Sequence, residues 1–138
     1  MKSKNILVTG GNGFIGSNLV DRLIGSGHSV FVIDDLSTGL KENSNPKAKY
    51  TFYDLVECLE HPAYLESYLL DNEIEVVYHL AASADVQMSV ESPEKTYLIN
   101  LLASIAIYNL CTKTHVNQFV FASTSAIFGP PKYLPVDE

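Results

Sequence analysis

Short apolar runs alternate along the chain with longer segments in which apolar residues recur at helical spacing. Short apolar runs bounded by glycine or polar residues are typical of buried β-strands. The pattern predicts strands over Ile6–Val8, Ser29–Ile33, Tyr50–Tyr53, Val76–Leu80 and Phe119–Ala122. It predicts helices over Gly13–Ile24, Ala63–Leu70 and Pro93–Thr114, the last with Ser92 as N-cap and Pro93 at its first position.

The remaining stretches are predicted to be loops. Residues 40–49, "LKENSNPKAK", have at most a short helical turn, and residues 129–138, "GPPKYLPVDE", have none. Strands that alternate with helices form βαβ units, in which a parallel sheet is covered on both faces. We therefore expect an α/β fold of the Rossmann type, with five strands of a doubly wound parallel sheet in this chain. Ligands of such sheets bind beyond the carboxyl ends of the strands, near the switch point.

A glycine-rich stretch, "TGGNGFIG", joins the first predicted strand to the first predicted helix and has the spacing G-x-x-G-x-x-G. We expect Gly10 to permit a tight turn, Gly13 to let a pyrophosphate approach the backbone, and Gly16 to let the helix pack against the strand. The free N–H groups and the positive end of the helix dipole, at Phe14 and Ile15, would then face the phosphates.

An acidic pair, Asp34 and Asp35, ends the second predicted strand. Asp34 lies 18 residues after Gly16, close to the spacing of about 20 at which a carboxylate binds the ribose hydroxyls of a dinucleotide. A P-loop is excluded, because Ser17 follows Gly16 where a P-loop needs its lysine. Strand, glycines, helix and carboxylate together predict a dinucleotide-binding site.

Composition narrows the class of protein further. The net charge of −7 argues against nucleic acid or an anionic membrane as the main partner. No apolar run is long enough for a membrane span, and the first residues do not form a signal peptide. Cys58 and Cys111 lie far apart without metal-ligand spacing, so we expect two buried free thiols in a cytoplasmic protein.

Five motifs occur in order and cover nearly the whole chain: "VTGGNGFIGSNLVDRL", "VIDDLSTG", "VVYHLAASADVQMSVESPEKTYLIN", "FVFASTSAIFG" and "YLPVDE". Together they resemble the extended short-chain dehydrogenase/reductase family, and most closely its branch of UDP-glucose 4-epimerases and related sugar-nucleotide enzymes. The resemblance implies that residues 1–138 are the N-terminal portion of an NAD-binding Rossmann domain. It also implies an isomerase that oxidises the C4 of a UDP-sugar, or another nucleotide sugar, with NAD and then reduces it again.

The same resemblance implies roles for single residues. Asp54 and Leu55 match the family's adenine contact, and Asn100 matches an asparagine that braces the loops beside the cofactor. Further cofactor contacts are implied for Asp35, Ser37, Thr38 and Gly39 after the second strand, Leu80, Ala81 and Ala82 after the fourth, and Ser123 after the fifth. Lys41 is expected at the surface and His79 in the core, without a role for either.

Thr124 matches the family's catalytic serine or threonine, whose hydroxyl binds the sugar oxygen that is oxidised. In related 4,6-dehydratases acidic residues follow this threonine, and decarboxylating relatives keep a glutamate two positions after it. Here the two positions are Ser125 and Ala126. The absence of a carboxylate favours simple oxidation and re-reduction, as in an epimerase.

The family's general base is the tyrosine of a Tyr-x-x-x-Lys motif, which does not occur in these 138 residues. Tyr108 and Lys113 come closest, but their spacing is wrong and they lie in the wrong helix. We therefore expect the N-terminal part of a longer enzyme, without its substrate-binding part and inactive alone. Two other interpretations stay open: a non-catalytic NAD-binding module, and an NAD-dependent dehydratase or reductase of the same superfamily.

Two further expectations concern the choice of cofactor and the assembly. Asp34 and Asp35 would repel the 2′-phosphate of NADP, and the nearest cation in the sequence is Lys41, so NAD is predicted. The predicted helix Pro93–Thr114 is apolar almost all round. A helix that covers one face of a sheet needs only a stripe of apolar residues, so this helix has more apolar surface than the sheet alone can cover. The resemblance implies that this helix helps to build a homodimer.

Overall fold

The computed structural model describes residues 2–124, 127, 129–130 and 133 of the chain. Its five strands form one parallel sheet in the order β3-β2-β1-β4-β5, which confirms the predicted Rossmann-type sheet. The strands are β1 (Asn5–Thr9), β2 (Ser29–Asp34), β3 (Lys49–Phe52), β4 (Val76–His79) and β5 (Gln118–Phe121). All five lie within a few residues of the predicted runs.

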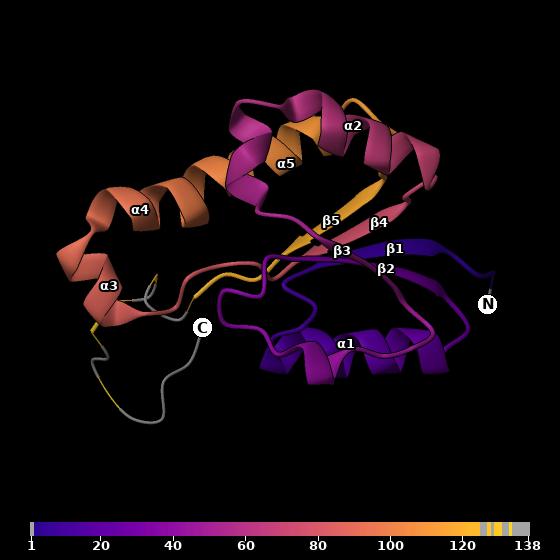
Figure 1. The fold of residues 1–138 in the computed structure, drawn as a ribbon, viewed down its shortest axis with the longest axis horizontal. Helices are drawn as coiled ribbons and strands as arrows, with labels where there is room; N and C mark the ends of the chain where they lie inside the picture. Colours follow the sequence, from indigo (N-terminus) through magenta and orange to yellow (C-terminus); the bar gives the residue numbers. More distant parts are fainter. Residues whose placement is uncertain (1, 125–126, 128, 131–132, 134–138) are drawn as a thin grey trace.

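Helices cover both faces of the sheet (Figure 1). Helix α1 (Phe14–Gly25) lies on one face, and α2 (Pro62–Asp71) and α5 (Ala103–Cys111) lie on the other. The remaining helical segments are α3 (Val86–Glu91), α4 (Pro93–Tyr97), the π-helix η3 (Leu98–Leu102), and the short 3₁₀-helices η1 (Lys41–Asn43) and η2 (Leu55–Leu59). Helices α3 and α4 project past the carboxyl ends of the strands, so they flank the edge where ligands bind in this fold.

Alternate residues of the strands feed two hydrophobic cores, one on each face of the sheet. Ile6 and Val8 of β1 pack toward α1 together with Val20, whereas Leu7 packs on the opposite face with Leu65 of α2. All of these side chains are buried. A strand that is buried on both faces needs a continuous apolar run, which is the pattern that predicted the parallel sheet.

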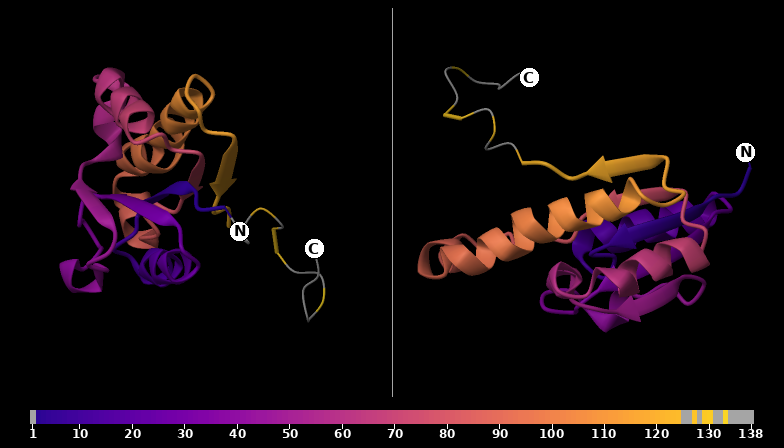
Figure 2. Two further views of the ribbon diagram at one scale, coloured as in Figure 1. Left: turned by 90° about the vertical axis from the view of Figure 1, so that its right-hand side faces the viewer. Right: turned by 90° about the horizontal axis from the view of Figure 1, so that it is seen from above.

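The long helix predicted over Pro93–Thr114 is helical from Pro93 to Cys111, so its predicted end lies three residues too far along the chain. The path is continuous (Figure 2), but the π-helix η3 interrupts it between α4 and α5. The wider π-turn brings Asn100 beside the loop that follows β4, where its amide bonds Ser83 in both directions. The helix ends at Cys111, where the hydroxyls of Thr112 and Thr114 donate to the carbonyls of Asn109 and Cys111.

Two local features differ from the prediction beside this helix. Helix α3 was not predicted; it begins where the side chain of Asp85 accepts the N–H of Met88. Ser92 does precede Pro93 as N-cap, but its side chain makes no capping hydrogen bond. Its backbone N–H donates to the carbonyl of Met88 and closes the end of α3. Of the tail predicted as loop, residues 131–132 and 134–138 lie outside the described part.

The two cysteines are buried and free, as predicted. Burial raises the pKa of Cys58 to about 11 and that of Cys111 to about 12, so both remain protonated thiols at neutral pH. No helix in the described part of the chain is long and apolar enough to cross a membrane.

Candidate functional site

A cavity of about 830 Å³ opens at the carboxyl ends of the strands, within the size range of ligand pockets. It spans the switch point between β1 and β4, where the order of the strands reverses. Fifteen predicted cofactor residues line it: Gly10, Gly13, Phe14, Ile15, Gly16, Asp34, Asp35, Ser37, Thr38, Gly39, Asp54, Leu55, Leu80, Ala81 and Ala82. Asn100, Ser123 and Thr124 are not among the lining residues.

Three glycines line this cavity, and at two of them a side chain would collide with neighbouring backbone. Gly10 has φ +69°, and a Cβ there would lie 2.9 Å from the backbone nitrogen of Ala81. A Cβ on Gly16 would lie 2.1 Å from the carbonyl oxygen of Gly10. Gly16 therefore lets the start of α1 pack closely against the turn that directly follows β1. Gly13 is the N-cap of α1 and offers no capping side chain.

The start of α1 faces the cavity with its backbone. The first N–H groups of an α-helix have no partner within the helix, and the helix dipole adds positive potential there. Phe14 and Ile15 are 85% and 67% exposed, so their side chains do not pack over the N–H groups at the start of α1. This arrangement suits an anion such as a phosphate.

The carboxylate of Asp34 is fixed by two backbone groups at the end of β2. Its Oδ2 accepts the N–H of Asn12 at 2.8 Å, and its Oδ1 accepts the N–H of Leu36 at 2.9 Å. Leu36 lies in the left-handed region with φ +59°, a strained conformation that turns the chain after the carboxylate. A Cβ on Gly39 would lie 2.9 Å from Asp34 Oδ1, so the following segment crosses directly over this side chain.

Asp35 is exposed and also lines the cavity. Its Oδ1 accepts from the backbone N–H of Ser37 at 2.8 Å and from the Ser37 hydroxyl at 2.6 Å. The two neighbouring carboxylates thus give this side of the cavity a negative charge.

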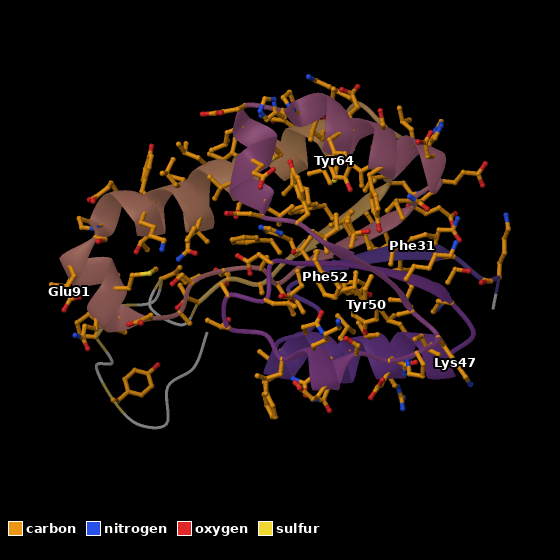
Figure 3. All side chains as sticks on the ribbon, in the orientation of Figure 1. Phe31, Lys47, Tyr50, Phe52, Tyr64 and Glu91 are labelled. Atoms are coloured by element: carbon orange, nitrogen blue, oxygen red, sulfur yellow. The ribbon has the colours of Figure 1, made fainter. Side chains whose placement is uncertain are left out.

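Asp54 and Leu55 form the wall that follows β3. Asp54 Oδ1 accepts the N–H of Val56 at 2.9 Å and caps η2, so this carboxylate stabilises the turn as well as lining the cavity. Leu55 is buried in the core, which leaves its backbone for ligand contact. The ring of Tyr53 packs on Tyr64, with centroids 4.8 Å apart. Figure 3 labels Tyr64 on the α2 side of the sheet.

A buried hydrogen-bond relay holds the wall that follows β4. Thr9 Oγ1 accepts the N–H groups of Leu80 and Ala81, both at 3.2 Å, and contacts His79 Nδ1 at 2.7 Å. His79 Nε2 contacts Ser104 Oγ at 2.8 Å, and that hydroxyl donates to the carbonyl of Asn100. The Ser104 hydroxyl already donates to Asn100, so it accepts from His79 Nε2, and the Thr9 hydroxyl donates to Nδ1. His79 is therefore the neutral tautomer with its proton on Nε2.

Burial lowers the pKa of His79 to about 4, which keeps the ring neutral at physiological pH. His79 is a core residue, as predicted, but the relay also makes it part of the frame of the site. Asn100 extends the same frame, because its Oδ1 accepts the Ser83 N–H at 2.8 Å and its Nδ2 donates to the Ser83 carbonyl at 2.9 Å. Asn100 therefore braces the loop after β4 and does not line the cavity.

Ser123 and Thr124 follow β5 and are exposed. Both lie at the carboxyl end of the sheet, while the neighbouring residues 125–126 lie outside the described part. The catalytic role of Thr124 therefore stays a prediction.

Sequence reasoning missed several contributors to the site. Asn12 is fully buried and bonds the loop that follows β2, and Tyr53 and Lys95 line the cavity. Other lining residues that had no predicted role are Ile33, Val56, Ser83, Asp85, Met88, Ile99, Ala103 and Ala122. Isolated residues without a periodic pattern give no sequence signal of this kind.

A second cavity, of about 380 Å³, lies at the opposite edge of the sheet and is lined by Asn5, Ser29, Lys49 and Asn72 among others. These residues stand at the amino ends of β1, β2 and β3 and after α2. Ligands of parallel α/β sheets bind at the carboxyl ends, so the larger cavity is the candidate site.

The chain matches the NAD dependent epimerase/dehydratase family over residues 6–138. A UDP-glucose 4-epimerase of Lactobacillus helveticus is 37% identical over 133 residues, which cover 96% of this chain and 39% of that protein. The crystal structure of UDP-glucose 4-epimerase from Brucella ovis in complex with NAD has a TM-score of 0.88 at 34% identity, covering 99% of this chain and 40% of that one.

A third similar protein is UDP-N-acetylglucosamine 4-epimerase from Methanobrevibacter ruminantium M1, solved in complex with UDP-N-acetylmuramic acid. Its TM-score is 0.85 at 38% identity, covering 100% of this chain and 43% of that one. The chain thus spans about two fifths of the length of the proteins that it matches.

Proposed function

This chain belongs to the NAD dependent epimerase/dehydratase family, and we propose that it is the NAD-binding portion of a sugar-nucleotide 4-epimerase. The observation that carries the proposal is the convergence of the glycine loop, the start of α1 and the fixed carboxylate of Asp34 on one cavity at the switch point. Similarity to UDP-sugar 4-epimerases, one of them solved with NAD, supports it.

The residues present fit a dinucleotide. A Cβ on Gly10 or Gly16 would collide with neighbouring backbone and distort the glycine loop, and the N-terminus of α1 would hold the pyrophosphate. Asp34 would accept hydrogen bonds from the adenosine ribose, and the wall at Asp54 and Leu55 would contact the adenine. The braced segment Leu80–Ala82 would form the opposite wall.

When bound, NAD supplies hydride transfer at the sugar C4. The part of this chain is to bind and orient the cofactor beneath the substrate. We infer that the Thr124 hydroxyl, which stands at the carboxyl end of β5, binds the oxygen of the reacting sugar carbon. The substrate would be a UDP-sugar or another nucleotide sugar.

We predict that the chain binds NAD more tightly than NADP. Asp34 and Asp35 line the cavity where the adenosine ribose would lie, and their charges would repel a 2′-phosphate. Isothermal titration calorimetry with both dinucleotides should give an NAD affinity at least about tenfold higher, a difference of about 1.4 kcal/mol. Equal or tighter binding of NADP would contradict the assignment, and no binding of either would refute the proposed function.

A non-catalytic NAD-binding module is the second candidate function. The general-base motif Tyr-x-x-x-Lys does not occur in these 138 residues. Tyr53, which lines the cavity, has its pKa raised to about 12, mainly by burial, so its phenol is a poor proton acceptor at neutral pH. Binding of NAD is common to both candidates, and turnover separates them.

We further propose a homodimer formed through the helix of α4, η3 and α5. Tyr97, Leu101, Ile105 and Tyr108 recur along one side of this helix and are 43–53% exposed. Large exposed apolar strips mark interaction sites. The net charge of −7 and the reduced cysteines support a protein of the cytoplasm that binds neither nucleic acid nor membrane.

We predict that Leu101→Glu lowers the self-association of the chain. A carboxylate in the middle of the apolar strip would have to be desolvated in the interface. Light scattering at tens of micromolar should give a dimer mass for the wild type and a monomer mass for the variant. Leu70→Glu, which changes a similarly exposed leucine on α2, is the control and should remain dimeric. A monomeric wild type would remove the proposal.

A further inference from the structure

Asn12 connects the glycine loop to the segment that follows the two acidic residues. Its side chain is completely buried. Its Nδ2 donates to the carbonyl of Leu40 at 3.1 Å and to Ser44 Oγ at 2.8 Å. The backbone carbonyl of Asn12 accepts the N–H of Leu40 at 3.2 Å and the side-chain Nδ2 of Asn43 at 2.9 Å. One residue thus clamps both ends of η1, which lies between Leu40 and Ser44.

The orientation of the Asn12 amide is fixed by its partners. The carbonyl of Leu40 can only accept a hydrogen bond, so the nitrogen of the amide must face it. Asn12 Oδ1 is then buried without a hydrogen-bond partner in the described part of the chain. A buried acceptor without a partner costs stability, so packing alone does not explain an asparagine here. What the asparagine contributes is the pair of hydrogen bonds from its Nδ2 to Leu40 and Ser44.

The clamped segment carries one cation, Lys41. Its ammonium lies 5.8 Å from the centroid of the Phe52 ring, at the end of β3. In Figure 3, Phe52 lies at the other end of β3 from Lys47. Asp34 and Asp35 line the cavity, whereas Lys41 does not. Lysine has a long flexible stem, so its reach depends on where the backbone around it is held.

We propose that Asn12 is a specificity-determining residue for the dinucleotide: its clamp on Leu40–Ser44 keeps Lys41 on Phe52, so that the charged side chains after β2 that line the cavity are the carboxylates of Asp34 and Asp35. A 2′-phosphate needs a nearby cation, and the clamp withholds the one that this segment has. The inference rests on the proposed binding of NAD. Asn12 does not line the cavity, so in the proposal it acts by positioning the segment Leu40–Ser44.

The test measures NAD and NADP affinities by calorimetry for the wild-type chain, Asn12→Ala, Lys41→Ala and the double variant. Asn12→Ala removes the two side-chain bonds of the clamp, to Leu40 and Ser44, and keeps the two bonds to the backbone carbonyl. The ratio of NAD to NADP affinity should then fall by about tenfold, because the loosened segment gives Lys41 access to the phosphate. Lys41→Ala alone should leave the ratio of the wild type. The double variant should regain the wild-type ratio, because the freed cation is gone.

Asn43→Ala and Ser44→Ala each remove one bond of the clamp from a more exposed position, so they test the proposal if Asn12→Ala does not fold. Each should lower the ratio in the same direction by a smaller factor. The ratio is the decisive readout, since mere loss of stability weakens both ligands alike. An unchanged ratio in the folded clamp variants, a changed ratio in Lys41→Ala, or no rescue in the double variant would overturn the inference. A wild type that binds neither dinucleotide overturns it together with the proposed function.

Discussion

Replacing Gly16 by alanine is expected to lower the affinity of the chain for NAD by about 100-fold, or about 2.8 kcal/mol. A Cβ at this position would lie 2.1 Å from the carbonyl oxygen of Gly10 and 2.8 Å from the Cα of Gly11. Both contacts are with backbone atoms, so no rotamer change can relieve them. The glycine loop and the start of α1 would have to move apart, and with them the N–H groups that would hold the pyrophosphate.

The same change should destabilise the fold by about 1–3 kcal/mol, as overpacking of a buried site does. Calorimetry with NAD and thermal unfolding measure the two effects separately. Gly25→Ala is the matched control, because Gly25 ends the same helix and a Cβ there meets nothing within 4 Å. That variant should keep its affinity for NAD and match or exceed the wild-type stability. Full NAD affinity in a folded Gly16→Ala chain would show that the loop does not hold the cofactor.

The sheet was predictable because its signal is local. A strand such as β1, buried on both faces, needs an apolar run, and the sheet order follows the usual handedness and crossover rules. The glycine loop was predictable for a similar reason, since its turn and close contacts require glycine at fixed spacing.

Features that depend on distant partners were not predictable. Asn12 is one polar residue among glycines, and its partners Leu40, Asn43 and Ser44 lie in a segment that reads only as a polar loop. His79 gave the signal of a core residue, and its burial is confirmed, but Thr9 and Ser104 come from other elements. The π-turn likewise depends on the tertiary bonds of Asn100, which helical periodicity does not contain.

Asp54 has two roles that the sequence pattern does not distinguish, capping a turn and lining the cavity. Its carboxylate caps η2, a role that any turn could have demanded, and the same residue lines the cavity. The sequence pattern alone was compatible with either role, and only the position of η2 at the end of β3 joins them.

The 138-residue chain is expected not to convert UDP-galactose to UDP-glucose at an enzymatic rate. The reaction needs a base for the C4 hydroxyl proton, and the resemblance assigns that role to the Tyr-x-x-x-Lys motif that these residues lack. The cavity tyrosine, Tyr53, does not replace it, because its raised pKa of about 12 opposes proton transfer near neutral pH. Loss of general-base catalysis alone removes about 10²–10⁴-fold in rate.

The measurement incubates the chain with NAD and UDP-galactose and follows UDP-glucose by chromatography, with a full-length UDP-glucose 4-epimerase as positive control. Binding of NAD, established by calorimetry on the same preparation, separates a missing base from a failure to fold or to bind. Product at the buffer level is the expected result. Turnover at about 1 s⁻¹ or faster, an ordinary enzymatic rate, would mean that a group within these residues is the base. Thr124→Ala would then show whether the hydroxyl that follows β5 takes part, because its loss should abolish that turnover.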